Sequence, residues 1–327
     1  MLGQYQIVHI KLKTMACRQL SWVKWAHMDL KYRALIIAAI VARFLPMRVG
    51  YFLAGCGGDA LFLLSARHRY IVGNNIKHIL GVELDKRRLR RKVRSVFKNL
   101  AKNYFDLTKL SQLRSGNLDR SVTIEGWHHL TKAVSNARGT IIATAHLGNF
   151  EFAAQVLAVR GIKMTIFVED FDSTPFLRCI AQLRQGNGSR ILPVSAGALR
   201  DCLQMLRHGG TVVIVCDRDI QGTGLKVKFF GEEASLPSGA VSLALRTGAT
   251  VVPIFSVRKS SNRFAICIEP PLELVDSGNR SHSVRANLER LVAIMENYIC
   301  QYPEQWVVLE PIWHNQAAAF NPTQHAH

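Results

Sequence analysis

GTIIATAHLGNFEFAAQVLAVRG, residues 139–161, changes its pattern at His146 and predicts the fold of its surroundings. Residues 140–145 form a short, mostly apolar and partly β-branched run, which is typical of a strand buried on both faces. After His146, Asn149 is a favourable helix N-cap, and apolar side chains then recur at helical spacing. The stretch therefore predicts a strand, a tight turn and a helix, with the histidine at the strand's carboxyl end, where open α/β sheets bind their ligands.

The alternation of strands and helices continues on both sides of this stretch. Further strands are expected at residues 122–127, 164–169, 191–194, 211–217, 250–258 and 263–269. Further helices are expected at residues 128–136, 176–184, 197–207, 238–247 and 284–298. Repeated strand–helix units predict an α/β fold with a mostly parallel central sheet flanked by helices.

The first third of the chain has a different composition. Residues 1–120 contain 23 of the 42 Lys and Arg but only 6 of the 23 Asp and Glu, a net charge of +17, whereas the remaining residues carry +2. Apolar helices are expected at 32–45 and 49–66, and KRRLRRKVRSVFK at 86–98 predicts a basic amphipathic helix that continues to Leu110. We therefore expect three parts: a basic helical, membrane-associating cap at 1–120, an α/β core at 121–315 and a disordered tail at 316–327.

The basic cap indicates an anionic partner, although a charged face that serves only solubility is the alternative. Nucleic acid is not favoured, because no zinc-ligand spacing, RNA-binding aromatic motif or helix-turn-helix accompanies the charge. The apolar run 34–42 is interrupted by Arg43 and the run 50–66 contains Asp59, so both fall short of a clear membrane span. The seven scattered cysteines lack a C-x-x-C pair, as expected for reduced thiols. We expect peripheral or monotopic attachment to anionic lipids at the cytoplasmic face of the cell membrane.

His146 is the candidate catalytic residue. An imidazole is well suited to take a proton from a hydroxyl near neutral pH, provided that a neighbouring group holds its ring. Glu151 falls in the first turn of the expected helix, and Asp217 and Asp219 end the expected strand 211–217 at the same edge of the sheet. No nucleophile of the chain itself accompanies them, so the activated hydroxyl belongs to a substrate or to water. A structural histidine is the alternative interpretation of the spacing alone.

HLGNFE at 146–151 resembles the H-x4-D/E motif of the lysophospholipid acyltransferase superfamily. It is most similar to the branch that contains the late lipid A biosynthesis acyltransferases and the phosphatidylinositol mannoside acyltransferases, where HLGNWE is usual. Three further blocks resemble that branch in the same order, at 217–231, 236–255 and 268–274. The resemblance covers roughly residues 33–313. Phe150 departs from the usual Trp, and Asp-Arg-Asp at 217–219 is closer to the mannoside enzymes than to the lipid A enzymes.

The resemblance implies a glycerolipid acyltransferase-like fold and a membrane-associated activity. A fatty acyl group would move from acyl-CoA or acyl carrier protein to a hydroxyl of a glycolipid or lysophospholipid, with no cofactor or metal. His146 would be the general base. In that branch an acidic residue near position 217 partners the histidine, and we expect Asp217 to do so together with Glu151.

Four further residues are expected to contact substrate. Asn149 lies within the motif, Arg184 borders a glycine-containing loop, and Arg218 and Asp219 follow the candidate Asp217. Arg218 could meet a phosphate or the developing oxyanion, whereas Asp219 has an alternative role in stabilising a turn. Two other functions stay open: a thioesterase or lipid hydrolase that uses the same base on water, and a non-catalytic module that binds anionic membranes.

Overall fold

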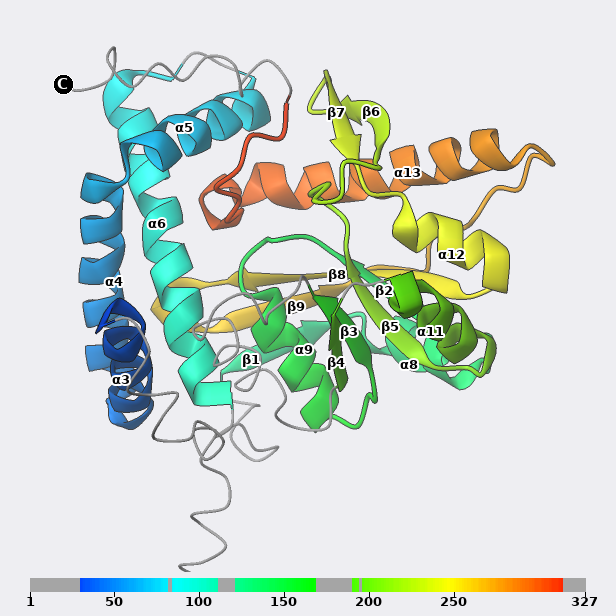
Figure 1. Cartoon of the computed structure of the whole chain (residues 1–327), viewed down its shortest axis with the longest axis horizontal. Coiled ribbons are helices and arrows are strands. Elements are labelled where there is room, and N and C mark those ends of the chain that lie inside the picture. The colour runs from blue at the N-terminus through cyan, green and yellow to red at the C-terminus, as the bar shows by residue number, and fades with distance from the viewer. Residues whose placement is uncertain (1–29, 82–83, 111–120, 169–189, 194–195, 314–327) are drawn as a thin grey trace, which may run out of the picture.

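The computed structural model describes residues 30–81, 84–110, 121–168, 190–193 and 196–313. The helix expected at 176–184, the basic residues before position 30 and the expected disordered tail lie outside the described residues. Figure 1 shows a central sheet with helices against it and a group of N-terminal helices at one end of the long axis.

Seven strands form the central sheet, in the order β1-β9-β8-β2-β5-β3-β4. They are β1 (Val122–Glu125), β2 (Thr140–Thr144), β3 (Thr165–Val168), β4 (Arg190–Pro193), β5 (Thr211–Val215), β8 (Thr250–Arg258) and β9 (Phe264–Ile268). Only β8 and β9 pair antiparallel, and every other neighbouring pair is parallel. The expectation of an α/β fold with a mostly parallel sheet is therefore confirmed.

Helices cover both faces of the sheet because the central strands are apolar on both sides. Ile141 and Ala143 of β2 belong to one hydrophobic cluster, with side chains of three helices: α11 (Ala196–Arg207), α12 (Gly239–Thr247) and α13 (Arg280–Gln301). Ile142, between them, points to the other cluster, with α8 (Trp127–Ser135) and α9 (Phe150–Val159). The alternation along β2 therefore separates two packed layers.

Among the described residues, the N-terminal group consists of α3 (Leu30–Phe44), α4 (Met47–Leu64), α5 (Ala66–Leu80) and α6 (Lys86–Lys109). The expected basic amphipathic helix is α6, which Asp85 caps by accepting a hydrogen bond from the Arg88 backbone. Its Val93, Val96 and Phe97 are buried and join the same hydrophobic cluster as α12 and α13. The N-terminal helices and the sheet thus share one continuous core.

Helix α4 lies directly against α6. A Cβ at Gly58 would sit 2.6 Å from the Lys98 Cα, so only glycine allows this approach. Asp59 does not interrupt α4, because Arg94 and Lys98 of α6 pair with its carboxylate at 2.6 and 3.3 Å. The helix consequently runs for 18 residues and is, by length and composition alone, the one helix among the described residues that could cross a membrane. The helix expected at 49–66 is thus present, whereas the sequence indicated no clear membrane span there because of Asp59.

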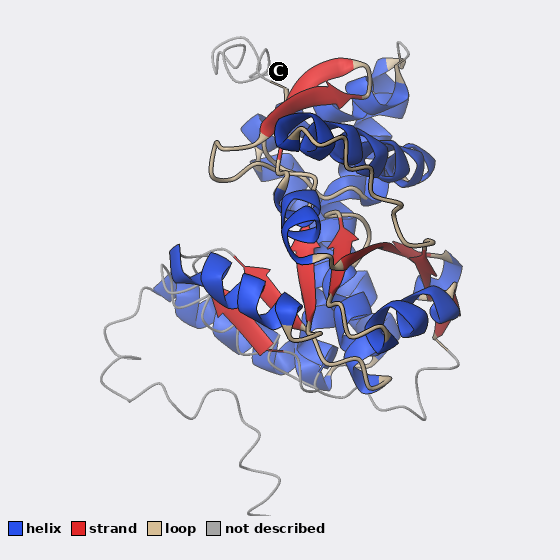
Figure 2. Cartoon of the chain, turned by 90° about the vertical axis from the view of Figure 1, so that its right-hand side faces the viewer, coloured by secondary structure: helices blue, strands red, loops and turns tan. Residues whose placement is uncertain are grey.

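Two elements were not predicted from the sequence. Helix α5 follows α4 after Ser65, and a hairpin of β6 (Leu225–Phe229) and β7 (Glu232–Leu236) stands apart from the central sheet. Figure 2 shows this two-stranded ribbon lying over a long helix, and β6 contacts α13. Its buried side chains are Val227, Phe229, Ala234 and Leu236, so the hairpin extends the core beyond the edge of the sheet.

Candidate active site

The turn between β2 and α9 places His146 at the carboxyl edge of the sheet. Gly148 adopts φ of +59°, and a Cβ there would lie 1.8 Å from the Ser256 carbonyl oxygen. Only glycine fits this conformation and this approach to β8. Asn149 then caps α9 by accepting a hydrogen bond from the Phe152 backbone at 3.0 Å, as the sequence predicted. The turn is therefore fixed at both ends.

Asp217 meets His146 because β2 and β5 are parallel neighbours. Thr144 pairs with Val215 at the ends of the two strands. His146 and Asp217 each follow that pair by two residues, so they lie side by side. The His146 backbone N–H donates to Asp217 Oδ2 at 2.8 Å, and the ring Nδ1 lies 2.8 Å from Asp217 Oδ1. One carboxylate therefore holds both the backbone and the ring of the histidine.

The charge state of Asp217 determines which nitrogen of His146 is available. Burial raises the pKa of this fully buried carboxyl, but the charge of His146 and hydrogen bonds from His146 and Trp306 together hold its pKa below the ordinary value. A carboxylate can only accept, so Nδ1 carries the proton of the 2.8 Å contact. In the neutral ring Nε2 is then left as the acceptor, on a side chain that is 23% exposed.

Trp306 completes the surroundings of Asp217 from a distant part of the chain. Its Nε1 donates to Asp217 Oδ2 at 2.7 Å. The segment around it pairs with the His146 turn, since the Val307 N–H donates to the His146 carbonyl and the Gly148 N–H donates to the Gln305 carbonyl, both at 2.9 Å. Trp306 was not predicted from the sequence, because no spacing links a residue 89 positions away to Asp217.

Glu151 lies in the first turn of α9 and is partly buried. The carboxylate in contact with His146 Nδ1 is that of Asp217, one of the two partners expected from the sequence. A direct catalytic role of Glu151 stays a prediction. The Phe150 ring, which replaces the usual Trp of the motif, packs edge-on against the imidazole with ring centres 5.4 Å apart.

The remaining candidates occupy different environments. Asn149 is buried and, besides capping α9, donates through Nδ2 to Asp106 at 2.8 Å. Arg218 forms an ion pair with Glu310, with 3.2 Å between Nη1 and Oε1. Asp219 accepts hydrogen bonds from the Gly224 backbone and the Ser235 hydroxyl, both at 2.8 Å, so it stabilises the turn before β6. Arg184 lies outside the described residues. Substrate contacts of these four residues stay predictions.

A buried polar cluster supports the turn from behind. Asp106 of α6 accepts hydrogen bonds from Tyr51 Oη at 2.7 Å and Asn149 Nδ2 at 2.8 Å, and pairs with Arg258 Nη2 at 2.6 Å. The Arg258 guanidinium also lies over the aromatic rings of Tyr51 and Phe264, 5.3 and 4.5 Å from their centres. Four elements, α4, α6, α9 and β8, therefore converge on one buried carboxylate next to the His146 turn.

A small apolar cavity of about 20 Å³ lies beside this turn, under α9, with Phe150, Ala153 and Ala154 among its lining. Within the part of the chain that the structure describes, no group of three or more His, Cys, Asp or Glu side chains is placed to hold a metal ion. The chemistry available from the described residues is that of an oriented imidazole beside apolar side chains.

Fold and site together define an α/β protein with a carboxylate-oriented histidine at the edge of a mostly parallel sheet. The particular family follows from comparison with known proteins. The chain belongs to the bacterial lipid A biosynthesis acyltransferase family, whose model matches residues 23–315. The family expected from the sequence is thereby confirmed.

Two curated relatives show which branch is similar. The chain is 25% identical over 224 residues to a phosphatidylinositol mannoside acyltransferase of Mycolicibacterium smegmatis, which covers 68% of this chain and 72% of the relative. It is 28% identical over 199 residues to the Mycobacterium tuberculosis protein of the same name, which covers 60% of each chain. The similarity to the mannoside enzymes agrees with the Asp-Arg-Asp sequence at 217–219.

Proposed function

We propose that this protein transfers a fatty acyl group from a thioester, acyl-CoA or acyl carrier protein, to a hydroxyl of a glycolipid at the cytoplasmic face of the cell membrane. The observation that carries the proposal is the His146–Asp217 pair, with Nδ1 held at 2.8 Å and Nε2 left as the acceptor. Family membership supports acyl transfer, and the two mannoside relatives support a glycolipid acceptor.

The proposed reaction needs one proton carrier and no covalent enzyme intermediate. His146 Nε2 takes the proton of the acceptor hydroxyl while its oxygen attacks the thioester carbonyl. Asp217 stabilises the imidazolium that forms, since it is a buried carboxylate in direct contact with the ring. When the tetrahedral intermediate collapses, the C–S bond breaks and the leaving thiolate receives the proton from His146. The products are an ester and a free thiol, and the base is regenerated.

Membrane attachment through α3 and α4 is part of the proposal. Large apolar side chains are strongly exposed on these helices, among them Phe44 at 74%, Phe52 at 69% and Leu64 at 84%. Exposed apolar surface of this extent is typical of a membrane-contacting face. Exposed basic residues follow it at the start of α5 and α6, including Arg67 and Arg87. Such neighbours suit anionic headgroups.

Product identification tests the proposed activity. Purified protein is incubated with labelled acyl-CoA, and separately with acylated carrier protein, in the presence and absence of a glycolipid extract. We expect an acylated glycolipid, identified by mass, that forms only when acceptor is present. Label that appears as free fatty acid regardless of acceptor would identify a hydrolase, and absence of turnover with every donor would leave a membrane-binding module.

Vesicle binding tests the attachment separately. Replacing Phe52 and Leu64 by Ser should weaken binding to vesicles containing phosphatidylglycerol, because both side chains are exposed and their loss leaves the core unchanged. Val275→Ser is the matched control, since this side chain is also exposed, at 42%, but follows β9 instead of belonging to α3 or α4. Equal vesicle binding of the double variant and the control would contradict attachment through α3 and α4.

A further inference from the structure

A basic pocket lies between α12 and α13, separate from the His146 turn. Its volume is about 730 Å³, within the range of small-molecule sites. Arg246 of α12 and Arg280, His282 and Arg285 of α13 line it, and none of its described lining residues is acidic. Glu289 lies beside it, with Oε1 4.0 Å from Arg285 Nη1. The pocket is therefore strongly positive.

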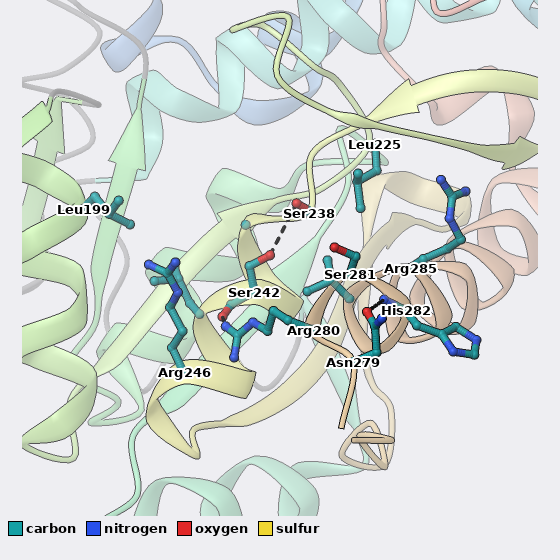
Figure 3. Close-up of a pocket in the computed structure, with 13 residues that line it drawn as sticks. Leu199, Leu225, Ser238, Ser242, Arg246, Asn279, Arg280, Ser281, His282 and Arg285 are labelled. Carbon is teal, nitrogen blue, oxygen red and sulfur yellow. Dashed lines mark hydrogen bonds between the residues drawn. The ribbon is translucent and has the colours of Figure 1, made fainter. Parts of the chain in front are cut away.

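Its arginines are placed to meet an anion. Arg246 is exposed and has no ion pair or hydrogen bond to another residue that the structure describes. The Arg280 guanidinium is held by one hydrogen bond from Nη2 to the Ser242 carbonyl, which leaves its other N–H groups for a ligand. Figure 3 shows both guanidinium groups on one side of Ser242 and the Ser281 hydroxyl on the other.

Backbone N–H groups at the pocket add partial positive charge to that of the arginines. The first turns of α12 and α13 both face it, through Gly239 and Ser281, and neither turn contains an acidic residue. The N-cap Ser238 makes no side-chain cap hydrogen bond to α12, and a Cβ at Gly239 would meet nothing within 4 Å. At α13 the N-cap Asn279 accepts from the His282 N–H at 3.1 Å, so the uncapped helix start at the pocket is that of α12. Free N–H groups at helix starts attract phosphates. Together with the arginines, they favour a phosphorylated ligand.

The position of the pocket favours a soluble ligand over a lipid headgroup. Figure 1 shows α12 and the start of α13 at the end of the long axis opposite α3 and α4, which carry the exposed apolar side chains. A headgroup in a bilayer seated on α3 and α4 would not reach it. Leu199, Leu225 and Leu243 supply an apolar lining suited to a flat base.

The pocket also lies within reach of the reaction. Asp219 follows Asp217 by two residues and accepts a hydrogen bond from Ser235 at 2.8 Å, and Ser238 at the pocket follows Ser235 by three. The five residue steps span at most about 18 Å of extended chain, and the side-chain contact between Asp219 and Ser235 adds its own length to this path. We propose that the pocket binds the phosphate-bearing nucleotide end of a coenzyme A thioester, whose arm extends along this path to His146. This inference rests on the proposed acyl transfer.

Binding of free coenzyme A, measured by calorimetry without acceptor or turnover, tests the pocket independently of the reaction. We expect Arg246→Ala with Arg280→Ala to weaken binding by roughly tenfold to a hundredfold, as for loss of charged hydrogen bonds. Arg246→Ala alone should weaken it less and keeps the Arg280–Ser242 contact. Lys132→Ala on α8 is the control with the same change in charge, and should bind as the wild type does. Absence of coenzyme A binding by the wild type, or equal binding by all variants, would overturn the proposal.

Kinetics and other ligands identify the source of the phosphate. With acyl-CoA as donor, the pocket variants should raise KM with little change in kcat. Normal KM values in an active double variant would contradict the coenzyme A pocket but leave the proposed acyl transfer standing. Coenzyme A binding at the pocket without any transfer would support the pocket but contradict the proposed acyl transfer. A loss confined to phosphatidylglycerol vesicles, or confined to the acylated carrier protein, would assign the pocket to a lipid or to an acidic protein and contradict our proposal.

Discussion

Asp217→Asn should abolish most catalysis while the fold persists. Oδ2 of Asp217 accepts from the His146 backbone and from Trp306, whereas the partner of Oδ1 among the described residues is the ring Nδ1. The amide oxygen of Asn should therefore take the Oδ2 position, which satisfies two donors, and its NH2 should face Nδ1. The ring must then accept at Nδ1 and carry its proton on Nε2, so it can no longer accept the proton of the acceptor hydroxyl.

The size of the effect follows from this change of tautomer. Loss of general-base catalysis costs roughly a hundredfold to ten-thousandfold in rate, or about 3–5 kcal/mol in activation free energy. The free energy of unfolding should fall by only about 1–2 kcal/mol, because neutral hydrogen bonds replace charged ones and none is lost. Initial rates of acyl transfer and urea unfolding measure the two quantities. A variant that keeps more than about a tenth of the wild-type rate would refute the reasoning.

Two matched variants isolate the role of this contact. Trp306→Phe removes one donor to Oδ2 but leaves the carboxylate on Nδ1, so its rate should fall much less than that of Asp217→Asn. Glu151→Gln tests the other carboxylate of the motif. A larger loss of transfer rate from Glu151→Gln than from Asp217→Asn would show that Glu151 is the carboxylate on which His146 mainly depends.

Three further predictions concern stability. Gly148→Ala should lower the free energy of unfolding by at least about 1–2 kcal/mol, since φ is +59° and the Cβ would clash with Ser256; an unchanged urea midpoint would contradict it. Asp106→Leu should cost about 3–5 kcal/mol by leaving Arg258 charged and buried, and adding Arg258→Met should restore part of it; a double variant no more stable than Asp106→Leu would contradict the pairing. Because the folded pKa of Asp217 lies below its ordinary value, its contribution to stability is present above about pH 4 and is lost as pH falls through the folded pKa. The stability gap between wild type and Asp217→Asn should therefore narrow on acidification, and a gap that widens would contradict the sign.

Local patterns in the sequence predicted much of the fold. Residues 140–145 and 211–217 are apolar and β-branched, so burial on both faces was visible in them, and β2 and β5 follow them closely. The basic face of 86–98 likewise predicted α6. These elements form because each segment's own periodicity matches the surface that it buries.

Contacts between distant segments were less visible. The approach of Asp217 to His146 could be predicted, because both follow strands whose carboxyl ends meet at one edge. Trp306 could not, since its indole reaches Asp217 only after α13 returns the chain to the turn. The pairing of Asp106 with Arg258, 152 residues apart, depends in the same way on how helices and sheet pack. Such contacts depend on packing between elements and leave no spacing in the sequence.

The most direct test of the account is a single-turnover measurement of acyl transfer by His146→Ala beside the wild type, with enzyme in excess over labelled thioester and glycolipid present. Urea unfolding of the variant beside the wild type provides the check that the variant is folded. We expect the ester-forming step of His146→Ala to slow by at least roughly a hundredfold while the wild type forms acylated glycolipid. A folded variant that forms the ester at the wild-type rate would contradict the central claim that His146 is the general base.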